Sequence, residues 1–310
     1  MQTHSDLWLV IINPASAGGR GKKRWPRLKR SLEERNILFH FVISENEDDI
    51  RTILKVEYEK GIRNFSILGG DGSFHILVNA VMHHGWPLQD IRLALFPAGT
   101  GNDWRKTHEI RNDPDHVAEL IARGSFVSHD VASIRSAENS WWYVNLLGAG
   151  LDAAAVDVYH KRMSGLPIGK IKYILALLVA LLGYRRQDVT IHCDDRDIYS
   201  GKFLNLNLAI GGYSGGGMHT VPHARFNDGR LEGVLVPRIS FFKILLNLPG
   251  LFNGKYVELE EVQTFSGRMV QMKFSQPNRI DADGEIMENS REFIVEIIPQ
   301  ALKVASAVVL

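Results

Sequence analysis

Three apolar runs in the N-terminal third of the chain each end in a loop of glycine and small polar residues. Residues 7–12 lead into Asn13, residues 66–68 into Gly69, and residues 93–96 into Pro97. A short apolar run bounded by glycine or proline predicts a buried strand. Ligands of open α/β sheets bind at the carboxyl ends of the strands, where glycine lets backbone N–H groups approach an anion. The three loops therefore predict a nucleotide-binding sheet.

These loops do not follow the standard phosphate-binding patterns. Gly21-Lys22 is followed by Lys23, so the chain lacks a P-loop at this position. Residues 148–153 satisfy the GxGxxA pattern, but Lys170 and Lys172 stand where a dinucleotide site needs an acidic residue. We interpret residues 148–153 as a chance match.

Several motifs, taken in order, resemble those of the diacylglycerol kinase catalytic domain family, which includes bacterial lipid kinases and the sphingosine and ceramide kinases. They are Asn13-Pro14, Gly69-Gly70-Asp71-Gly72-Ser73, Pro97-x-Gly99-Thr100-x-Asn102-Asp103, Gly215-Gly216-Gly217, Pro222-x-Ala224 with Asp228-Gly229-x-Leu231, and Asp283-Gly284-Glu285. The ordered set runs from residue 13 to residue 285, and it is far more specific than any one motif. Ser73 keeps the hydroxyl of the family's threonine, whereas His75 and Ile76 replace an asparagine and a glutamate.

The resemblance implies an ATP- and Mg²⁺-dependent kinase that phosphorylates a hydroxyl of a membrane lipid such as diacylglycerol. It makes Glu285 the catalytic base and puts Asp71 and Asp103 beside the phosphates, with Asp130 as a further acid that could join them. Carboxylates beside phosphates require Mg²⁺ or another partner between them, and Asp71 could instead cap the helix that starts at Ser73. The nucleotide contacts it implies are Asn13, Ser44, Gly69, Gly70, Asp71, Gly72, Ser73, Phe74, His75 and Thr100.

The resemblance also implies a structural Mg²⁺ on the late Asn227-Asp228-Gly229 segment. The Asp228 carboxylate and the main-chain carbonyls of Arg225 and Arg230 would hold it, because Mg²⁺ prefers oxygen ligands. A metal-free turn is the alternative reading of this segment.

Two other functions remain open from the residues. An NAD kinase-like enzyme shares the GGDG motif, although residues 97–103 and 222–231 argue against it. A nucleotide-binding regulator without catalysis is the second alternative, since His75 and Ile76 depart from the family pattern; Glu285 argues for an enzyme, because a regulator needs no base.

Length and pattern predict two domains in the 310 residues. Residues 1–130 alternate strands and helices, which predicts a nucleotide-binding α/β domain with a parallel sheet. Residues 131–310 carry short β-rich runs, which predict a mainly antiparallel β-sandwich with inserted helices that binds the lipid. The last residues are apolar enough to pack as a final strand back on the first domain.

Charge and cysteine content limit the partners. The net charge of +1 gives no argument for nucleic acid, and the single Cys193 suits a reducing compartment, which predicts a cytoplasmic protein. Residues 158–187 hold six Lys or Arg, no acid and an apolar run at 174–182, which predicts peripheral attachment to anionic lipid. The cations would be Lys161, Arg162, Lys170, Lys172, Arg185 and Arg186. A buried helix with a basic end is the alternative, and homodimerisation is left open.

Overall fold

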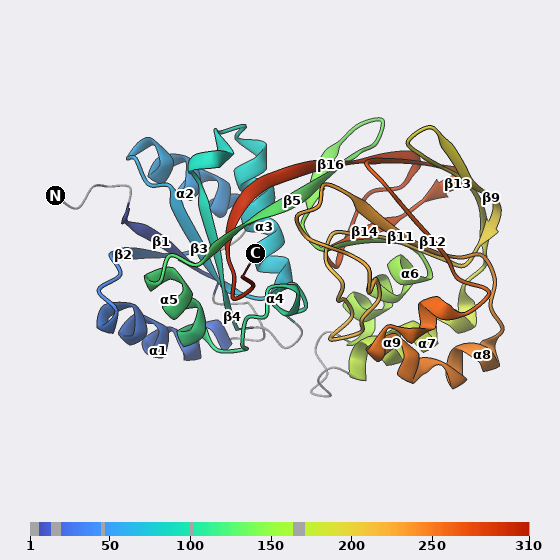
Figure 1. Cartoon of the computed structure of the whole chain (residues 1–310), viewed down its shortest axis with the longest axis horizontal. Helices are drawn as coiled ribbons and strands as arrows, with labels where there is room; N and C mark the ends of the chain where they lie inside the picture. Colours follow the sequence, from blue (N-terminus) through green and yellow to red (C-terminus); the bar gives the residue numbers. More distant parts are fainter. Residues whose placement is uncertain (1–5, 14–19, 45–46, 99–101, 164–170, 310) are drawn as a thin grey trace. The chain divides into compact units, whose positions relative to one another are not determined.

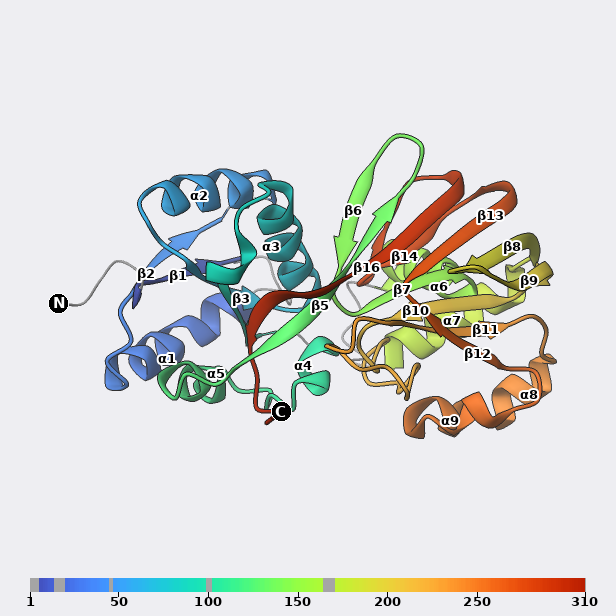
Figure 2. The same cartoon turned by 45° about the horizontal axis from the view of Figure 1, so that its top comes forward.

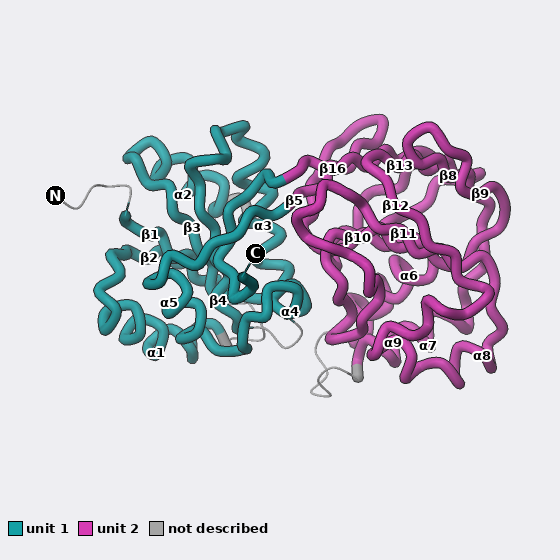
Figure 3. The backbone as a smooth tube through the Cα atoms, viewed as in Figure 1, with its two compact units in different colours: residues 1–129, 300–310 teal, residues 130–299 magenta. Residues whose placement is uncertain are grey.

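The chain forms two compact units in the computed structural model, which describes residues 6–13, 20–44, 47–98, 102–163 and 171–309. Unit 1 comprises Met1–His129 and Gln300–Leu310, and unit 2 comprises Asp130–Pro299 (Figure 3). Two strands carry the chain across the unit boundaries, β5 (Phe126–Arg135) and β16 (Ser290–Ala305).

Unit 1 alternates strands and helices. Its elements are β1 (Trp8–Ile12), α1 (Arg20–Glu34), β2 (Phe39–Ile43), α2 (Glu47–Glu59), β3 (Asn64–Gly69), α3 (Asp71–His83), β4 (Arg92–Pro97), α4 (Trp104–Thr107) and α5 (Pro114–Ala122), with a 3₁₀ turn at Leu88–Asp90. The strands pair in parallel in the order β2-β1-β3-β4, and the end of β16 adds to β4 through Lys303 and Val304 (Figure 1). The prediction of an α/β domain with a parallel sheet is confirmed.

Burial explains why β1 and β3 are continuous apolar runs. Every residue of β1 and of β3 is buried, as expected of central strands in a parallel sheet with helices on both faces. The edge strand β2 is only half-buried, and Ile43 is 57% exposed.

Unit 2 is built mainly from antiparallel strands. Its elements are β6 (Ser140–Tyr143), β7 (Leu146–Gly150), α6 (Leu151–Val158), a π-helical turn (Tyr159–Met163), α7 (Ile171–Gly183), β8 (Gln187–Cys193), β9 (Arg196–Phe203), β10 (Asn205–Ala209), β11 (Leu231–Val236), α8 (Phe241–Leu246), α9 (Leu248–Asn253), a 3₁₀ turn (Lys255–Glu258), β12 (Gln263–Gly267), β13 (Met269–Asn278), β14 (Ile280–Ala282) and β15 (Glu285–Ile286). One sheet runs β12-β11-β10-β7-β14-β15 (Figure 2). The strands β13, β8 and β9 follow β16 in that order, in the sheet to which β4 also belongs. The antiparallel β-rich second half with inserted helices is confirmed.

One β-rich run of unit 2 contains two strands. The apolar run at 141–147 contains both β6 and β7, because the Asp283 carboxylate accepts the N–H groups of Val144, Asn145 and Leu146, each at 3.0 Å. The Asp283 side chain thus satisfies the N–H groups of Val144 and Asn145, which lie between the two strands, and that of Leu146 at the start of β7.

Buried histidines join the C-terminal tail to the rest of unit 1. His108 and His129 have no exposed surface, their rings lie 5.0 Å apart, and His108 Nδ1 lies 3.1 Å from Ser306 Oγ. Burial is the main reason why the pKa of His108 lies well below its usual value, and the neighbouring His129 lowers this pKa further. The folded protein therefore keeps His108 neutral under conditions that protonate an exposed histidine.

We expect this histidine to make unfolding pH-dependent. Below about pH 6.5, His108 binds a proton in the unfolded chain but stays neutral in the folded protein. The free energy of unfolding therefore falls as the pH falls from about 6.5 toward the lowered pKa of folded His108. In the His108→Asn variant, the free energy of unfolding should fall less steeply with falling pH, by up to about 1.4 kcal/mol per pH unit. Urea unfolding between pH 7 and 5 measures it, with the exposed His83→Asn as control. Identical slopes in wild type and His108→Asn would contradict the prediction.

Candidate functional site

The predicted nucleotide residues gather at the carboxyl edge of the unit 1 sheet. Asn13 follows β1, the Ser44 N–H donates to Ile12 O at 3.0 Å, and Gly69 pairs with Pro97 at the ends of β3 and β4. The strand order changes direction between β1 and β3, which is where open α/β sheets bind ligands. Thr100, also a predicted contact, lies outside the described residues.

Asp71 connects the two central motifs. Its carboxylate accepts the Asp103 N–H at 2.8 Å and the Trp104 N–H at 3.1 Å, at the start of α4. The alternative that Asp71 caps the helix starting at Ser73 is wrong, because Asp71 is itself the first residue of α3 and Gly70 is the N-cap. These two bonds fix the residue 69–73 loop against residues 103–104.

Cations balance the carboxylates at this edge. Asp103 Oδ1 lies 3.0 Å from Lys106 Nζ. Burial lowers the pKa of Arg105, and the carboxylates of Asp71 and Asp103 oppose that shift. Arg24 of α1 donates to Pro97 O at 2.5 Å, which places a third cation near the end of β4. Both carboxylates thus have a protein partner: Asp71 accepts two backbone N–H groups, and Asp103 pairs with Lys106.

The start of α3 supplies the predicted phosphate loop. Gly70 precedes the helix, Gly72 is half-buried and Ser73 is buried. Phe74 packs against Trp104 with ring centroids 4.3 Å apart, and its N–H donates to Gly70 O. Its side chain is therefore a core group, and the predicted nucleotide contact of Phe74 has no support in these interactions. His75 is buried, and its carbonyl accepts from Asn79 Nδ2.

Glu285 begins β15 of unit 2, directly after a tight hairpin turn. Asp283 and Gly284 both have positive φ, 52° and 89°, which is typical of a two-residue type I′ turn. Three backbone N–H groups hold the Asp283 carboxylate, and His160 Nε2 lies 2.9 Å from Gly284 O. The turn is thus fixed at both residues, and the half-buried Glu285 follows on a rigid strand.

The predicted structural metal residues lie in one turn of unit 2. Asp228 Oδ1 accepts the Arg230 N–H at 3.1 Å, and Arg230 Nε donates to Ser266 Oγ. The Asp130 carboxylate also binds this turn, because it accepts the Gly229 N–H at 2.7 Å. Asp228 is exposed, and a carboxylate near the carbonyls of Arg225 and Arg230 is a donor set that suits Mg²⁺. Metal binding here remains a prediction.

We expect Mg²⁺ without nucleotide to raise the melting temperature of the wild type and not of Asp228→Ala. A ligand that binds only the folded state stabilises it by about 2.7 kcal/mol at 100 times its Kd. Differential scanning calorimetry with and without Mg²⁺ measures the gain, and the exposed Asp195→Ala serves as control. A wild type that does not respond to Mg²⁺ would leave residues 227–229 as a turn alone.

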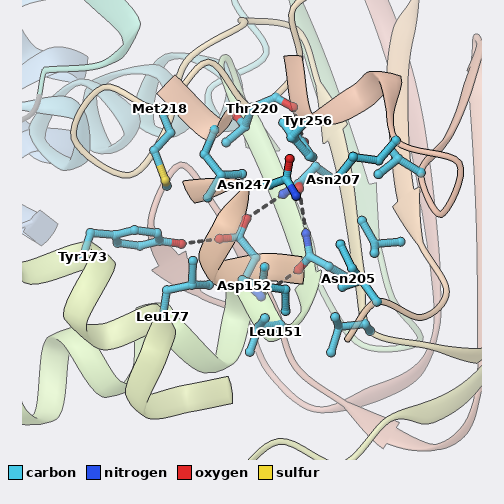
Figure 4. A pocket seen from close by; sticks show the side chains of 17 residues that line it. Leu151, Asp152, Tyr173, Leu177, Asn205, Asn207, Met218, Thr220, Asn247 and Tyr256 are labelled. Carbon is cyan, nitrogen blue, oxygen red and sulfur yellow. Dashed lines mark hydrogen bonds between the residues drawn. The ribbon is translucent and has the colours of Figure 1, made fainter. Parts of the chain in front are cut away.

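Unit 2 contains a pocket of about 100 Å³ that the sequence did not predict. Its walls are mainly aliphatic, from α6, α7, β10, β11, α8 and α9 (Figure 4). At one side Asp152 accepts bonds from the Tyr173 hydroxyl and from Asn207 Nδ2, and Asn205 Nδ2 donates to Asn207 Oδ1. The pocket thus combines an apolar volume with a polar cluster.

Gly148 explains how this cluster fits beside the sheet. It lies opposite Asn207 on one neighbouring strand and Asp281 on the other. A Cβ at Gly148 would lie 2.4 Å from both Asp152 Oδ2 and Asp281 Oδ1, so only glycine leaves room for the two carboxyl groups. Burial raises the pKa of Asp281 well above its usual value, and the neighbouring Asp152 carboxylate raises it further. The GxGxxA pattern is therefore not a dinucleotide-binding loop. Gly148 was the sequence feature from which the close approach of Asp152 and Asp281 could have been predicted.

The basic segment 158–187 differs from the expectation in part. Lys161 pairs with Asp157, Lys172 is half-buried, and Lys170 lies outside the described residues. Arg185 and Arg186 are exposed. Helix α7 buries Ala176 and Ala180 but leaves Leu182 78% exposed, so it is neither a fully buried helix nor a uniformly basic one. Within the described ranges, no helix is both long and apolar enough to cross a membrane.

Comparison with known proteins agrees with this architecture. The model of the diacylglycerol kinase catalytic domain matches residues 7–134, and that of the YegS C-terminal NAD kinase beta sandwich-like domain matches residues 145–306. A diacylglycerol kinase of Mycobacterium tuberculosis (strain CDC 1551 / Oshkosh) is 26% identical over 281 residues, covering 89% of this chain and 87% of that protein.

Solved structures share the fold. A diacylglycerol kinase from Bacillus anthracis str. Sterne aligns with a TM-score of 0.74 at 16% identity over 97% of each chain. An NAD kinase from Archaeoglobus fulgidus in complex with ATP aligns with a TM-score of 0.51 at 11% identity over 97% of this chain and 93% of that chain. The fold is thus common to lipid kinases and NAD kinases. Both family matches, together with the ordered motifs, show that the chain belongs to the diacylglycerol kinase catalytic domain family, with the YegS-type C-terminal domain.

Proposed function

We propose that this protein transfers the γ-phosphoryl group of ATP to a hydroxyl of a membrane lipid, such as diacylglycerol. The observation that carries the proposal is the pocket of unit 2, which offers an aliphatic volume beside a hydrogen-bonding cluster. An amphiphile has both parts, an acyl chain for the first and a polar head for the second. Its lining contains no Lys, Arg or His among the residues that the structure describes, so it provides no cation for the pyrophosphate of NAD.

The carboxyl edge of unit 1 supports ATP as the phosphoryl donor. The N-terminus of α3 has its positive dipole end at residues 70–73, where backbone N–H groups can bind phosphate oxygens. Asp71 holds this loop to residues 103–104 through two backbone bonds, so the loop is organised before the nucleotide binds. Mg²⁺ bound with ATP would neutralise the charge that develops on the transferring group, with Asp103 as a nearby carboxylate.

Glu285 of unit 2 would accept the proton of the lipid hydroxyl. A base must be held on a rigid element and remain accessible to substrate. The fixed turn at Asp283-Gly284 gives Glu285 the first property, and its partial exposure gives the second.

The function is tested with purified protein, radiolabelled ATP, Mg²⁺ and lipid alcohols in mixed micelles, with NAD in a parallel reaction. We expect the label in the organic phase with diacylglycerol or a related alcohol. Label in NADP would support the NAD kinase alternative. ATP binding without transfer to any acceptor would indicate a regulator, and either result would overturn the proposal.

A further inference from the structure

Helix α8 exposes almost all of its apolar side chains. Phe242 and Leu246 are 76% and 80% exposed, and Phe241 and Leu245 are 41% and 36% exposed. We define these four residues as the α8 face. Such a concentration of exposed apolar groups on a six-residue helix marks a surface that another phase or molecule covers.

The helix is held firmly in this orientation. Ser240 Oγ caps it by accepting the Lys243 N–H at 3.2 Å, and Lys243 Nζ lies 2.6 Å from Glu261 Oε1. Ile244 packs inward in the same apolar cluster as Leu177 and Leu181 of α7. The inward contacts therefore fix α8 with its larger apolar side chains directed outward.

Basic residues adjoin the α8 face. Arg186 Nη1 donates to Pro237 O, which joins the end of α7 to the segment just before α8. Arg185 and Arg238, in these two segments, are both exposed, and Leu182 at the end of α7 adds another exposed apolar side chain. Apolar residues beside arginines fit the interface of an anionic bilayer, because the apolar side chains enter the acyl region and the arginines contact the lipid phosphates.

We infer that the α8 face is the membrane-docking surface of unit 2 and that it inserts into an anionic bilayer. A second copy of the chain fits less well, because a two-fold contact brings the same patch, with its arginines, against itself. Tyr173 and Leu177 of α7 line the apolar pocket (Figure 4). Ile244 of α8 lines it as well. The same helix thus faces the pocket with one side and exposes apolar groups with the other, so a lipid could leave the bilayer beside the pocket. This inference rests on the proposed function for its lipid substrate, but docking itself can be measured without catalysis.

Vesicle binding of the full chain, without ATP, tests the surface. The probes are phosphatidylcholine vesicles and equimolar phosphatidylcholine–phosphatidylglycerol vesicles. We expect the wild type to prefer the anionic vesicles. The double variant Phe242→Ser/Leu246→Ser should lose roughly 10- to 100-fold in partitioning, and Arg185→Gln/Arg238→Gln about 30-fold on anionic vesicles alone. The control Val56→Ser/Met269→Ser removes two other exposed apolar side chains and should bind as wild type does.

Two further measurements separate the possible failures. Sedimentation equilibrium detects self-association: a wild-type dimer that the α8 variant converts to monomer would assign the surface to a second copy and overturn docking. Phosphorylation of a short-chain, water-soluble diacylglycerol tests the proposed function independently, and the α8 variant should retain it. Unchanged vesicle binding by the folded α8 variant overturns the inference even if the enzyme phosphorylates lipid, whereas absent phosphorylation of every lipid by wild type overturns the function alone.

Discussion

Glu285→Gln should lose phosphoryl transfer by roughly 10² to 10⁴-fold while ATP affinity stays unchanged. The amide has nearly the same shape as the carboxylate but cannot accept the proton of the attacking hydroxyl. Its turn depends on Asp283 and Gly284 rather than on residue 285, so the fold should be retained. Initial rates in mixed micelles measure the loss, and isothermal titration calorimetry measures ATP binding.

Glu292→Gln is the matched control for this experiment. Glu292 is an exposed acid of β16 that contacts Gln271 and Lys273, so its amide should leave the rate unchanged. Normal turnover by Glu285→Gln would refute its role as base. An equal loss in both variants would point to a general effect of charge.

Gly70→Val should abolish measurable ATP binding in a folded protein. Gly70 has φ −114° and ψ −166°, an extended conformation that other residues adopt, so valine imposes no left-handed strain. The bulky side chain instead occupies the space through which phosphate oxygens approach the N-terminus of α3. We expect at least about a 100-fold loss of affinity, since several phosphate contacts depend on this approach.

Calorimetric titration with ATP and a melting curve separate binding from folding. Gly183→Val is the control, because Gly183 faces open space and lacks a positive φ. A folded Gly70→Val protein with wild-type ATP affinity would place the nucleotide site elsewhere.

The sequence determined the class of both units because burial and turn chemistry act locally. Central strands such as β1 read as continuous apolar runs, and the Asp283-Gly284 pair specifies its own tight turn. The motifs were specific enough to identify the family, and Asn13, Gly69 and Pro97 do lie at the carboxyl ends of neighbouring strands.

Tertiary structure alone decided which partners the polar side chains take. Asp71 bonds to the backbone of residues 103–104, and Asp130 to that of Gly229, across separations in sequence that no local pattern encodes. Phe74, inside the phosphate motif, proved to be a core residue because Trp104 packs on it.

The pocket and the α8 face likewise depend on contacts that the sequence alone does not predict. Asp152, Asn207 and Asp281 come from a helix and two strands that meet only when β10, β7 and β14 pair around Gly148. In the sequence, the residues of α8 are a short run that is apolar except for Lys243. Only the packing of Ile244 and the Lys243–Glu261 pair determines that Phe242 and Leu246 face outward. Local sequence sets what an element is, whereas long-range packing sets what each of its side chains touches.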